Sequence, residues 1–599
     1  MSETIRLLEW AIERTWHILR FEGVRAIGRR MRRLLVQLRH GGPPVFPLQA
    51  RSLEEQYRAW LHAQELRSRN SDAVFCSETH ATDEILISVV VMNSSAHMKG
   101  LRETLASIMR QRHQGWEVII TCPPSLVAGA RKIFEDFKVG NAHRVHIVEA
   151  EGKFYGHFSK GVPDSSGVLV WVLRAGDVLD PEALHSVADA FLNAPETDML
   201  YCDEDRINHD GVRTAPFFKP SWSPDLFLST NYLSYSTAVR RPLLMELHAG
   251  KMLTETPTQY DCLLRLSERS SNVVHIPKVL YHAGSPQSNG NLSDRVGQPE
   301  TAALQSALRR RGIRGSVEPG VKGRMRIRYE LSRTPLVTII IPTRDRVQHL
   351  SRCLAGLNAR TSYSALEVIV LDNGSEQDQT KQYLAEVSSK WRVLSCPGAF
   401  NYSALNNRGA KMANGELVLF LNDDTEVCVS EWLTIMVEHA MRPQVGAVGA
   451  KLLFPDGRIQ HAGVVLGVGG TAGHAFRHQR DDGGSYCGLA DMVRNCSAVT
   501  GACMMVPRSL FMRMGGFDEQ LPVEFNDVDL CLRLQGEGYR IVYTPDAVLY
   551  HYENATRQGA QAPEDEKHFR VRWAELLAKG DPYYNPNLTL RREDWSLNV

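Results

Sequence analysis

Two adjacent carboxylates follow a short apolar run in the second half of the chain. Leu417-Val-Leu-Phe-Leu421 is apolar throughout and comes after the turn signal Asn414-Gly415, a pattern typical of a fully buried parallel strand. The run ends in Asn422, Asp423 and Asp424. Ligands of open α/β sheets bind at the carboxyl ends of strands, and paired acids there are costly without a cation, so this turn predicts a divalent metal that neutralises phosphate. The alternative is a polar turn that caps the next helix.

Three more side chains further along the chain are suited to proton transfer or metal binding. Asp527 and Asp529 lie in the first turns of a predicted helix, where carboxylates also stabilise the positive end of the helix dipole. Asp529 stands four residues before Arg533 and is the expected helical partner of that arginine. His551 follows the strand-like stretch 547–550 and is expected to complete a metal site, to contact phosphate or to have a structural role.

Composition places these groups in a large globular protein. The chain has 599 residues, a formal net charge of +1 and 11 cysteines, none of them in a Cys-x-x-Cys pair. The charge argues against a general nucleic-acid binder, and the cysteine pattern argues against a zinc ribbon or a disulfide framework and favours a reducing cytoplasm. No apolar run approaches the roughly 18–20 residues that cross a bilayer, and the N-terminus lacks the apolar core of a signal peptide. We therefore expect a cytoplasmic protein, or one peripheral to the inner face of the cytoplasmic membrane.

The N-terminal segment, residues 1–52, is rich in arginine. Apolar positions that fall on one helical face are Leu8, Ile12, Trp16 and Leu19. A basic amphipathic helix of this kind either lies on anionic lipid or docks on the body of the protein itself. Residues 53–84 have the pattern of a helix followed by a polar linker.

Two long stretches alternate strand and helix patterns, as βαβ units require. Strand patterns occupy residues 86–91, 117–120, 145–148 and 168–173 in the first stretch, and 337–342, 367–371, 391–394 and 417–421 in the second. In each stretch the fourth strand pattern runs into an acidic turn. This internal duplication of a roughly 230-residue unit predicts two tandem doubly wound α/β domains. The polar stretch 283–335 between them reads as a linker with a helix at 299–312.

The second stretch resembles the inverting nucleotide-sugar glycosyltransferases of family 2, which have the GT-A fold. The resemblance covers about residues 335–560 and rests on motifs in the right order: Ile341-Pro-Thr-Arg-Asp-Arg346, Leu371-Asp-Asn-Gly-Ser375, Asn401-Tyr-Ser-Ala-Leu-Asn-Asn407, Leu421-Asn-Asp-Asp-Thr425, Val499-Thr-Gly-Ala502, Gly515-Gly-Phe-Asp-Glu519, Glu524-Phe-Asn-Asp-Val-Asp-Leu530 and His551-Tyr-Glu553. The first stretch resembles the amino half of tandem-domain bacterial polysaccharide and O-antigen glycosyltransferases through residues 201–205, 218–225 and 276–282.

The resemblance implies an α/β fold class with two tandem GT-A domains, which are Rossmann-like with a mixed, mostly parallel sheet, after an α-helical N-terminal segment. The expected parts are a basic helical region and linker (1–84), a degenerate GT-A domain (85–290), a linker (291–334) and a family 2 GT-A domain with a C-terminal helical extension (335–599).

The resemblance also implies roles for single residues. Asp527 corresponds to the general base that deprotonates the acceptor hydroxyl, and Asp424 with His551 to the ligands of Mg²⁺ or Mn²⁺. Asn422 takes the first position of the Asp-x-Asp motif as a tolerated variant. Asp372 corresponds to the acid that contacts the nucleotide base or ribose. The residues expected around the donor are Pro342, Thr343, Arg344, Asp345, Asp372, Asn373, Asn407, Asp423, Thr500 and Gly501.

The first stretch departs from the family pattern. Thr121-Cys-Pro-Pro124 has no carboxylate for a nucleoside, and Arg174-Ala-Gly-Asp177 keeps only the last acid of its turn. We expect Arg174 to stand in for part of a metal, and the domain to be a weak or inert catalyst that orients a polysaccharide acceptor. Residues expected to match Asp424, Asp527 and His551 are Asp177, Asp261 and His282. Aromatic residues that either stack on sugar rings or belong to the core are Phe217, Phe218 and Trp222.

The function implied by the resemblance is transfer of a sugar, with inversion, from a UDP- or dTDP-linked donor to a growing cell-surface glycan on a polyprenyl diphosphate lipid. Expected contacts include the inner membrane or polysaccharide-assembly proteins, and no nucleic acid. One alternative is a non-catalytic glycan-binding scaffold. Another is a nucleotidyltransferase, which needs a glycine-rich basic loop after its first strand, whereas Thr343-Arg-Asp-Arg346 has no glycine. Residues 463–470 are expected to form an acceptor-side loop.

Overall fold

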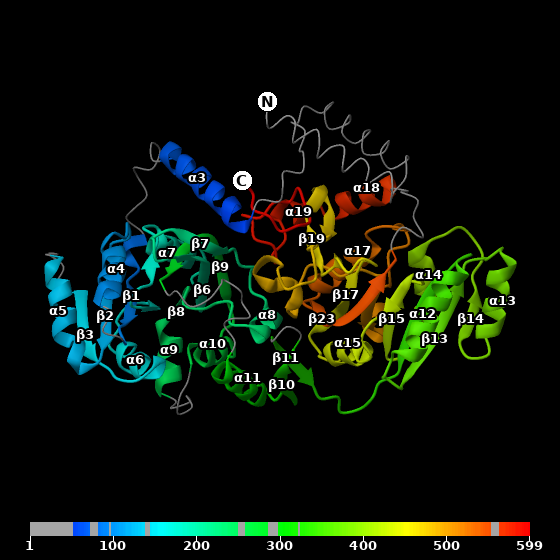
Figure 1. Cartoon of the computed structure of the whole chain (residues 1–599), viewed down its shortest axis with the longest axis horizontal. Helices are drawn as coiled ribbons and strands as arrows, with labels where there is room; N and C mark the ends of the chain where they lie inside the picture. The colour runs from blue at the N-terminus through cyan, green and yellow to red at the C-terminus, as the bar shows by residue number, and fades with distance from the viewer. Residues whose placement is uncertain are drawn as a thin grey trace. The chain divides into compact units, whose positions relative to one another are not determined.

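A computed structural model describes residues 52–71, 82–94, 98–137, 144–249, 258–284, 297–320, 324–552 and 562–599. The chain divides into two compact units, residues 1–56 and 57–599, and the second unit holds both large sheets (Figure 1). The basic amphipathic helix expected in the N-terminal segment, on lipid or docked on the protein itself, lies outside the described residues. Within the described ranges, no helix has the length and apolar character needed to span a bilayer.

The first large sheet has nine strands in the order β3-β2-β1-β4-β8-β6-β9-β5, with β7 added beside β6. Its strands are β1 (Ile87–Met92), β2 (Trp116–Cys122), β3 (Val145–Glu149), β4 (Leu169–Arg174), β5 (Val178–Leu179), β6 (Met199–Ile207), β7 (Arg213–Phe217), β8 (Thr237–Arg240) and β9 (Val273–Ala283). Strands β1 to β4 pair in parallel, whereas β8 runs antiparallel to both β4 and β6.

The second large sheet has ten strands in the order β14-β13-β12-β15-β22-β17-β23-β16, with β18 beside β17 and β21 beside β23. Its strands are β12 (Val337–Thr343), β13 (Leu366–Asp372), β14 (Arg392–Ser395), β15 (Leu417–Leu421), β16 (Thr425–Val427), β17 (Val445–Leu453), β18 (Ile459–His461), β21 (Arg494–Asn495), β22 (Cys503–Pro507) and β23 (Arg540–His551). Strand for strand, its main order repeats that of the first sheet, so the predicted tandem α/β duplication is confirmed.

Helices separate the first four strands of each large sheet, as the alternating pattern predicts (Figure 1). Those up to the linker are α3 (Leu53–Ser71), α4 (Met98–Met109), α5 (Val127–Asp136), α6 (Phe154–Gly161), α7 (Ala183–Asn193), α8 (Pro224–Ser229), α9 (Arg241–Ala249), α10 (Gln259–Ser267) and α11 (Gln298–Arg310). Those of the second half are α12 (Val347–Ala359), α13 (Asp378–Val387), α14 (Tyr402–Met412), α15 (Trp432–Ala440), α16 (Arg508–Arg513), α17 (Asn526–Gly536), α18 (Pro563–Arg572) and α19 (Ala574–Lys579).

The central strands are buried on both faces, which explains their continuous apolar runs. All residues of β12 and β15 are buried, as expected of parallel strands covered by helices on each side. Leu419 in β15 packs in one core cluster with Leu350 and Leu354 of α12. Because the interior of the sheet is apolar, polar side chains are confined to the ends of these strands, where β15 gives way to Asn422.

The linker contains more structure than its polar sequence suggests. The predicted helix at 299–312 is confirmed by α11, but a two-stranded hairpin of β10 (Gly315–Pro319) and β11 (Met325–Tyr329) follows it. Residues in β11 alternate between buried and half-buried. This strand, with its period of two, was not predicted from the sequence. Arg328 of this hairpin donates to Glu438 of α15 at 2.7–3.1 Å, which ties the linker to the second sheet.

A buried charge cluster joins the two sheets. Asp225, at the start of α8 in the first half, is 2% exposed. Its carboxylate accepts hydrogen bonds from Arg442 Nη1 at 2.5 Å, from Asn495 Nδ2 at 2.7 Å and from Arg540 Nη1 at 3.4 Å. All three donors belong to the second half. Nearby, the N–H of Phe218 donates to the hydroxyl of Tyr486 at 2.8 Å.

The C-terminal residues return to the first sheet. Asn585 Nδ2 donates to both carboxylate oxygens of Asp203, at 3.0 and 2.9 Å, and to the carbonyl of Lys219 at 2.9 Å. The N–H of Ser221 donates to the carbonyl of Pro582 at 2.9 Å. The chain therefore runs from the first half to the second and then back to the first.

Candidate active site

The acidic turn after β15 lies against the end of β23. Because β16 pairs antiparallel with β23, Thr425 stands opposite His551, and this register brings the imidazole to the turn. His551 Nε2 lies 3.0 Å from Asp424 Oδ1 and 3.3 Å from Asn422 Nδ2. Asp424 is 3% exposed and His551 9%. The structure thus brings together the two residues expected to bind a metal.

The contact of His551 with Gln460 places a hydrogen on Nδ1 of the imidazole. Its Nδ1 lies 2.6 Å from Gln460 Oε1, and an amide oxygen only accepts, so Nδ1 carries a hydrogen. In the neutral ring Nε2 then has the lone pair, so that it and the Asp424 carboxylate together can bind a cation, whereas in the charged ring Nε2 would donate to Asp424. Among the described residues, no group of three or more His, Cys, Asp or Glu side chains lies close enough together to hold a metal ion. Two protein ligands suit Mg²⁺ or Mn²⁺, which take their remaining ligands from water and phosphate.

Asp423 points to the neighbouring strand end. Its Oδ2 accepts a hydrogen bond from Thr343 Oγ1 at 2.6 Å, so the end of β12 and the acidic turn are joined directly. Burial raises the pKa of Asp423 to about 7, while the bond from Thr343 opposes the rise and the carboxylate of Asp424 adds to it. A cation bound at this turn would stabilise the ionised form of Asp423.

Asp372 and Asn373 occupy the loop after β13, next to β12. Asp372 Oδ1 accepts from the N–H and the hydroxyl of Ser375, at 2.9 and 2.6 Å. The N–H of Asn373 donates to the carbonyl of Thr343 at 3.0 Å, and its Nδ2 to the carbonyl of Cys396 at 2.9 Å. Asn373 Oδ1 is buried and has no hydrogen-bond partner among the described residues. This loop offers a carboxylate and an amide oxygen to a ligand at the strand ends.

Arg344 and Asp345 differ in what they do for the loop. Asp345 has a left-handed backbone (φ 52°), and its Oδ1 accepts from the N–H groups of Glu376 and Gln377 at 2.7 and 2.8 Å. It therefore orders the approach to α13. Arg344 is 45% exposed and pairs with Glu376 at 3.2 Å, so its guanidinium stays at the rim. Pro342 is buried within β12.

Asp527 is held by the loop that precedes β22. Its Oδ2 accepts from the N–H of Gly501 at 2.7 Å, and the carbonyl of Gly501 accepts from the hydroxyl of Tyr402 at 2.8 Å. A Cβ added at Gly501 would lie 3.0 Å from that hydroxyl oxygen, so the close approach favours glycine. The next residue, Ala502, accepts through its carbonyl from the N–H of Asn422 at 3.1 Å. Residues 500–502 therefore touch both the acidic turn and Asp527.

Asp529, on the same helix, is engaged in packing. It pairs with Arg533 at 2.8 Å, as the helical spacing predicts, and accepts from Trp573 Nε1 at 3.0 Å. Asn407 is also used by a neighbouring turn. Its Oδ1 accepts from the N–H of Phe517 at 2.8 Å and its Nδ2 donates to the carbonyl of Phe517 at 2.9 Å. A contact between Asn407 and a nucleotide stays a prediction.

In the first half, a guanidinium neutralises the carboxylate that corresponds to Asp424. Val178 stands opposite His282 as Thr425 stands opposite His551, which matches Asp177 with Asp424. Asp177 is 1% exposed. Arg174 grips it through Nε at 3.2 Å and Nη2 at 3.1 Å, and its own N–H adds a bond at 3.0 Å. This fork is the geometry that arginine uses for carboxylates, and it leaves the acid paired with an internal cation.

The predicted match of Asp261 with Asp527 is wrong. Asp261 pairs with Arg265 four residues on, at 3.0 Å, as Asp529 pairs with Arg533, so Asp261 corresponds to Asp529. The position of Asp527 is taken by Gln259, whose Nε2 donates to the carbonyl of Ser234 at 2.6 Å. The error arose because the first helix carries one acid, Asp261, with a glutamine two residues before it, where the second helix carries two acids.

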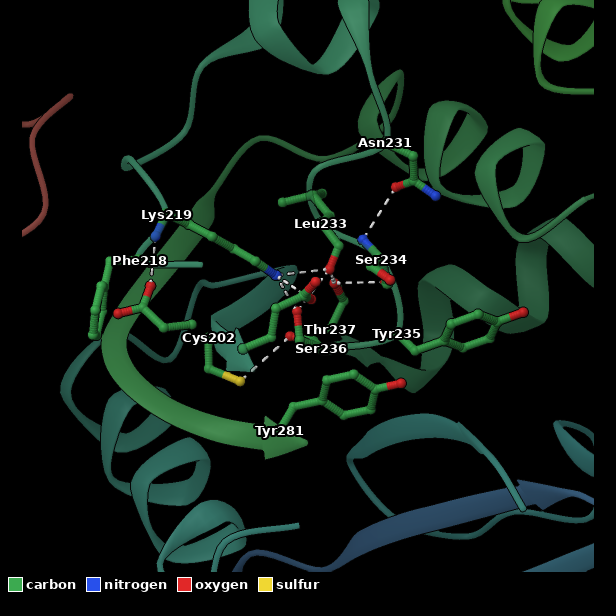
Figure 2. Close-up of polar contacts among 12 residues, drawn as sticks. Cys202, Phe218, Lys219, Asn231, Leu233, Ser234, Tyr235, Ser236, Thr237 and Tyr281 are labelled. Carbon is green, nitrogen blue, oxygen red and sulfur yellow. Dashed lines mark hydrogen bonds and ion pairs between the residues drawn. The ribbon is translucent and has the colours of Figure 1, made fainter. Parts of the chain in front are cut away.

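Figure 2 shows a lysine of the first half, Lys219, among polar groups. Lys219 is fully buried, and its Nζ donates to Glu204 Oε2 at 2.8 Å, to the carbonyl of Leu233 at 3.2 Å and to the hydroxyl of Ser236. Phe217 and Phe218, 2% and 0% exposed, belong to the same interior. These two aromatic rings are core residues, which decides against their stacking on sugar.

Comparisons with known proteins agree with this division. Residues 338–483 match the model of "Glycosyl transferase family 2", and residues 417–574 that of "Glycosyl transferase family group 2". An O-antigen biosynthesis protein, RfbC of Myxococcus xanthus, is 38% identical over 570 residues, 93% of this chain and 44% of the relative. An uncharacterized protein, y4gI of Sinorhizobium fredii, is 37% identical over 86% of this chain and 58% of the relative. The chain thus spans about half the length of these relatives.

A solved mannosyltransferase of Pyrobaculum calidifontis, in complex with GDP-Man and Mn²⁺, superposes with a TM-score of 0.31 at 21% identity, over 43% of this chain and 68% of that one. Similarity at this level does not establish a common fold. The sequence matches cover the whole of the second sheet and the residues gathered around Asp424 and Asp527. The second half of the chain, over residues 338–574, is thus similar to glycosyl transferase family 2.

Proposed function

We propose that the second half transfers a sugar from a nucleotide-diphosphate donor to a growing cell-surface polysaccharide, with inversion at the anomeric carbon and with the help of a divalent metal. The observation that carries the proposal is one site with two different groups. A buried Asp424–His551 pair is suited to bind a cation, and across residues 500–502 the carboxylate of Asp527 is held in a fixed orientation. The family-model matches and a relative named for O-antigen biosynthesis support the same class.

In the proposed reaction, Asp527 takes the proton of the acceptor hydroxyl. The oxygen of that hydroxyl forms the new bond to the anomeric carbon as the bond from this carbon to the diphosphate oxygen breaks. The N–H of Gly501, at 2.7 Å from Oδ2, and the N–H of Val528, at 2.8 Å from Oδ1, hold the carboxylate of Asp527 in place. Asp424 and His551 would hold the metal, which neutralises the charge of the leaving diphosphate when it is bound.

The donor's nucleoside is proposed to lie along the ends of β12 and β13. Asp372 and Asn373 lie at these strand ends. The buried Asn373 Oδ1 has no hydrogen-bond partner among the described residues, which supports the presence of a ligand whose N–H or O–H donates a hydrogen bond to it. We propose a UDP- or dTDP-linked sugar, with Thr500 and Gly501 lining the sugar. The first half acts as a non-catalytic body that orients the acceptor, because Arg174 and Gln259 replace a metal and a base.

The acceptor is proposed to be a lipid-linked glycan at the inner face of the cytoplasmic membrane. A reducing compartment suits the cysteines, since none of the ten in the described ranges forms a disulfide. The membrane contact itself is proposed for the basic N-terminal segment, and vesicle binding of the chain with and without residues 1–52 would test it.

A transfer assay with a panel of nucleotide sugars tests the catalytic proposal. Transfer is expected in the presence of Mn²⁺. The activity should disappear in excess EDTA and return when Mn²⁺ is added back. Asp527→Asn is expected to lower kcat about 10²–10⁴-fold, the usual contribution of a general base. Glu537→Gln, an exposed acid at the end of the same helix, is the matched control and should keep full activity.

Two results would contradict the proposal. Full activity in EDTA would exclude a metal from the reaction, and a near wild-type rate for Asp527→Asn would exclude Asp527 as the general base. A non-catalytic scaffold predicts a different outcome in the same experiment, namely glycan binding without stabilisation by any nucleotide sugar, since a bound ligand raises the melting temperature by mass action.

A further inference from the structure

Gln460 occupies the middle of the short strand β18 and is 2% exposed. This strand pairs with the end of β17, which in turn pairs with β23, the strand that ends in His551. The side chain of Gln460 therefore lies inside the sheet, on the side of His551 opposite to Asp424. None of the family motifs quoted above includes Gln460.

Both ends of the Gln460 amide are used by the same residue. Oε1 lies 2.6 Å from His551 Nδ1, and Nε2 donates to the carbonyl of His551 at 3.4 Å. The opposite orientation of the amide would place its oxygen against that carbonyl oxygen, two acceptors in contact. The hydrogen-bond network thus fixes the orientation of the amide, and with it the hydrogen on Nδ1 of the imidazole.

We infer that Gln460 is a positioning residue that presents the Nε2 lone pair of His551 to the metal beside Asp424. The hydrogen on Nδ1 forces the lone pair onto Nε2, which lies 3.0 Å from Asp424 Oδ1. Outer-sphere partners of this kind set the tautomer and the ring orientation of a metal-binding histidine. The inference rests on the proposed function, because it assumes that the metal binds between Asp424 and His551.

The first half of the chain provides an internal comparison. His282, the counterpart of His551, has its Nδ1 2.5 Å from Asp205 Oδ1, and the same carboxylate accepts from Tyr57 and Arg213. Its Nε2 lies 4.0 Å from Asp180, while Asp177 is held by Arg174. Where the acid has an internal cation, the histidine is held by a charged network. Where the acid is proposed to bind a metal, a neutral amide orients the histidine.

The experiment measures Mn²⁺ binding to the full chain in the presence of inorganic diphosphate, with free Mn²⁺ followed by electron paramagnetic resonance. Diphosphate supplies phosphate ligands without assuming a nucleotide. Gln460→Leu is expected to weaken Mn²⁺ binding about 10–100-fold, the range for lost outer-sphere partners. Gln460→Glu is expected to stay within a few-fold of wild type, because its carboxylate still accepts from Nδ1. Gln479→Leu is the matched control, since Gln479 donates to the carbonyl of Asp594 at 2.6 Å, away from His551.

A second measurement separates positioning from folding. The nitrogen chemical shifts of His551 are expected to report a hydrogen on Nδ1 in the wild type and a mixture of tautomers in Gln460→Leu. Should the leucine variant fail to fold, Gln460→Asn replaces it, because the shorter amide cannot reach Nδ1 and is expected to show the same loss.

The outcomes distinguish this inference from the proposed function. Absence of Mn²⁺ binding to the wild type overturns both. Mn²⁺ binding by the wild type with equal affinity in Gln460→Leu or Gln460→Asn overturns the role of Gln460 alone. Loss in the leucine variant with retention in Gln460→Glu and Gln479→Leu supports it.

Discussion

Replacing Asp225 by alanine tests whether the buried charge cluster holds the two halves together. The side chain of Asp225 is 1% exposed and that of its partner Arg442 9%. Apart from Asp225, the described contacts of Arg442 are with neutral groups, the Tyr329 hydroxyl at 3.1 Å and the carbonyl of His439 at 3.4 Å. Asp225→Ala therefore leaves a buried cation without a counter-charge.

The structure sets the size of the effect. Removing one partner of a buried ion pair costs about 3–5 kcal/mol, because the remaining charge is left desolvated. For a domain of 150–250 residues, each kcal/mol lowers Tm by about 2–4 °C, so the expected loss is roughly 6–20 °C. Asp225→Asn keeps the shape and loses only the charge, and a smaller loss is expected. Asp210→Ala, whose side chain is 64% exposed, is the control and should leave Tm unchanged.

The pH dependence has a definite sign. Burial alone would raise the pKa of Asp225, but Arg442 and Arg540 lower it well below its usual value. Because the folded-state pKa is depressed, this contribution to stability is complete above the unfolded pKa of about 3.9 and is lost as pH falls below it. The Tm difference between wild type and Asp225→Ala is therefore expected to be constant from neutral pH to about pH 5 and to shrink below about pH 4.

Thermal unfolding followed by circular dichroism is the assay. Wild type, Asp225→Ala, Asp225→Asn and the double variant Asp225→Ala/Arg442→Met are compared at several pH values. The double variant is expected to regain part of the lost Tm, since the uncompensated cation is gone. A Tm for Asp225→Ala within about 2 °C of wild type, or a difference that grows as pH falls, would refute the reasoning.

Three other predictions concern single contacts. Arg174→Met leaves the buried Asp177 without its fork and is expected to cost about 1–3 kcal/mol in urea unfolding; adding Asp177→Asn should recover part, and an unchanged midpoint would disprove the pairing. Gly516→Ala places a Cβ 2.4 Å from Asn407 Oδ1, whereas Gly538→Ala meets nothing within 4 Å at a similar positive φ, so Tm should fall further in the first, and equal losses would exclude the clash. Burial, together with the charge of Arg442, lowers the pKa of His439 to about 3. The contribution of neutral His439 to stability is therefore complete above about pH 6.5 and is lost as pH falls. His439→Phe should flatten the pH dependence of Tm between about pH 6.5 and 4, and a slope identical to that of the wild type would count against this reasoning.

Much of the fold could be predicted from the sequence, because strand and helix periods are local properties. The apolar run at 417–421, the acidic turn after it and the duplication were all readable, and Arg174 was identified as an internal cation before any geometry was known. The hairpin at 315–329 was missed, although β11 alternates in the sequence as it does in the structure. Its strands are short, and only their packing on Glu438 shows which face is buried.

The contacts of the site depended on long-range packing that no local pattern reports. Gln460 reaches His551 across 91 residues, and nothing in the segment around Gln460 points to an imidazole. The Asp-x-x-x-Arg spacing was present in both halves, and reading it would have matched Asp261 with Asp529 correctly. Asp345 caps backbone N–H groups of residues 376 and 377 through long-range packing, and its predicted contact with the donor stays a prediction.

The return of the C-terminus to the first half has a consequence for how the protein is made. Asp203 is fully buried and is bonded by Asn585, 382 residues later in the chain. Synthesis at about 5–20 residues per second separates the two by roughly 20–80 s. During that interval the nascent first half holds a carboxylate whose amide partner does not yet exist, so this contact can form only after residue 585 has left the ribosome.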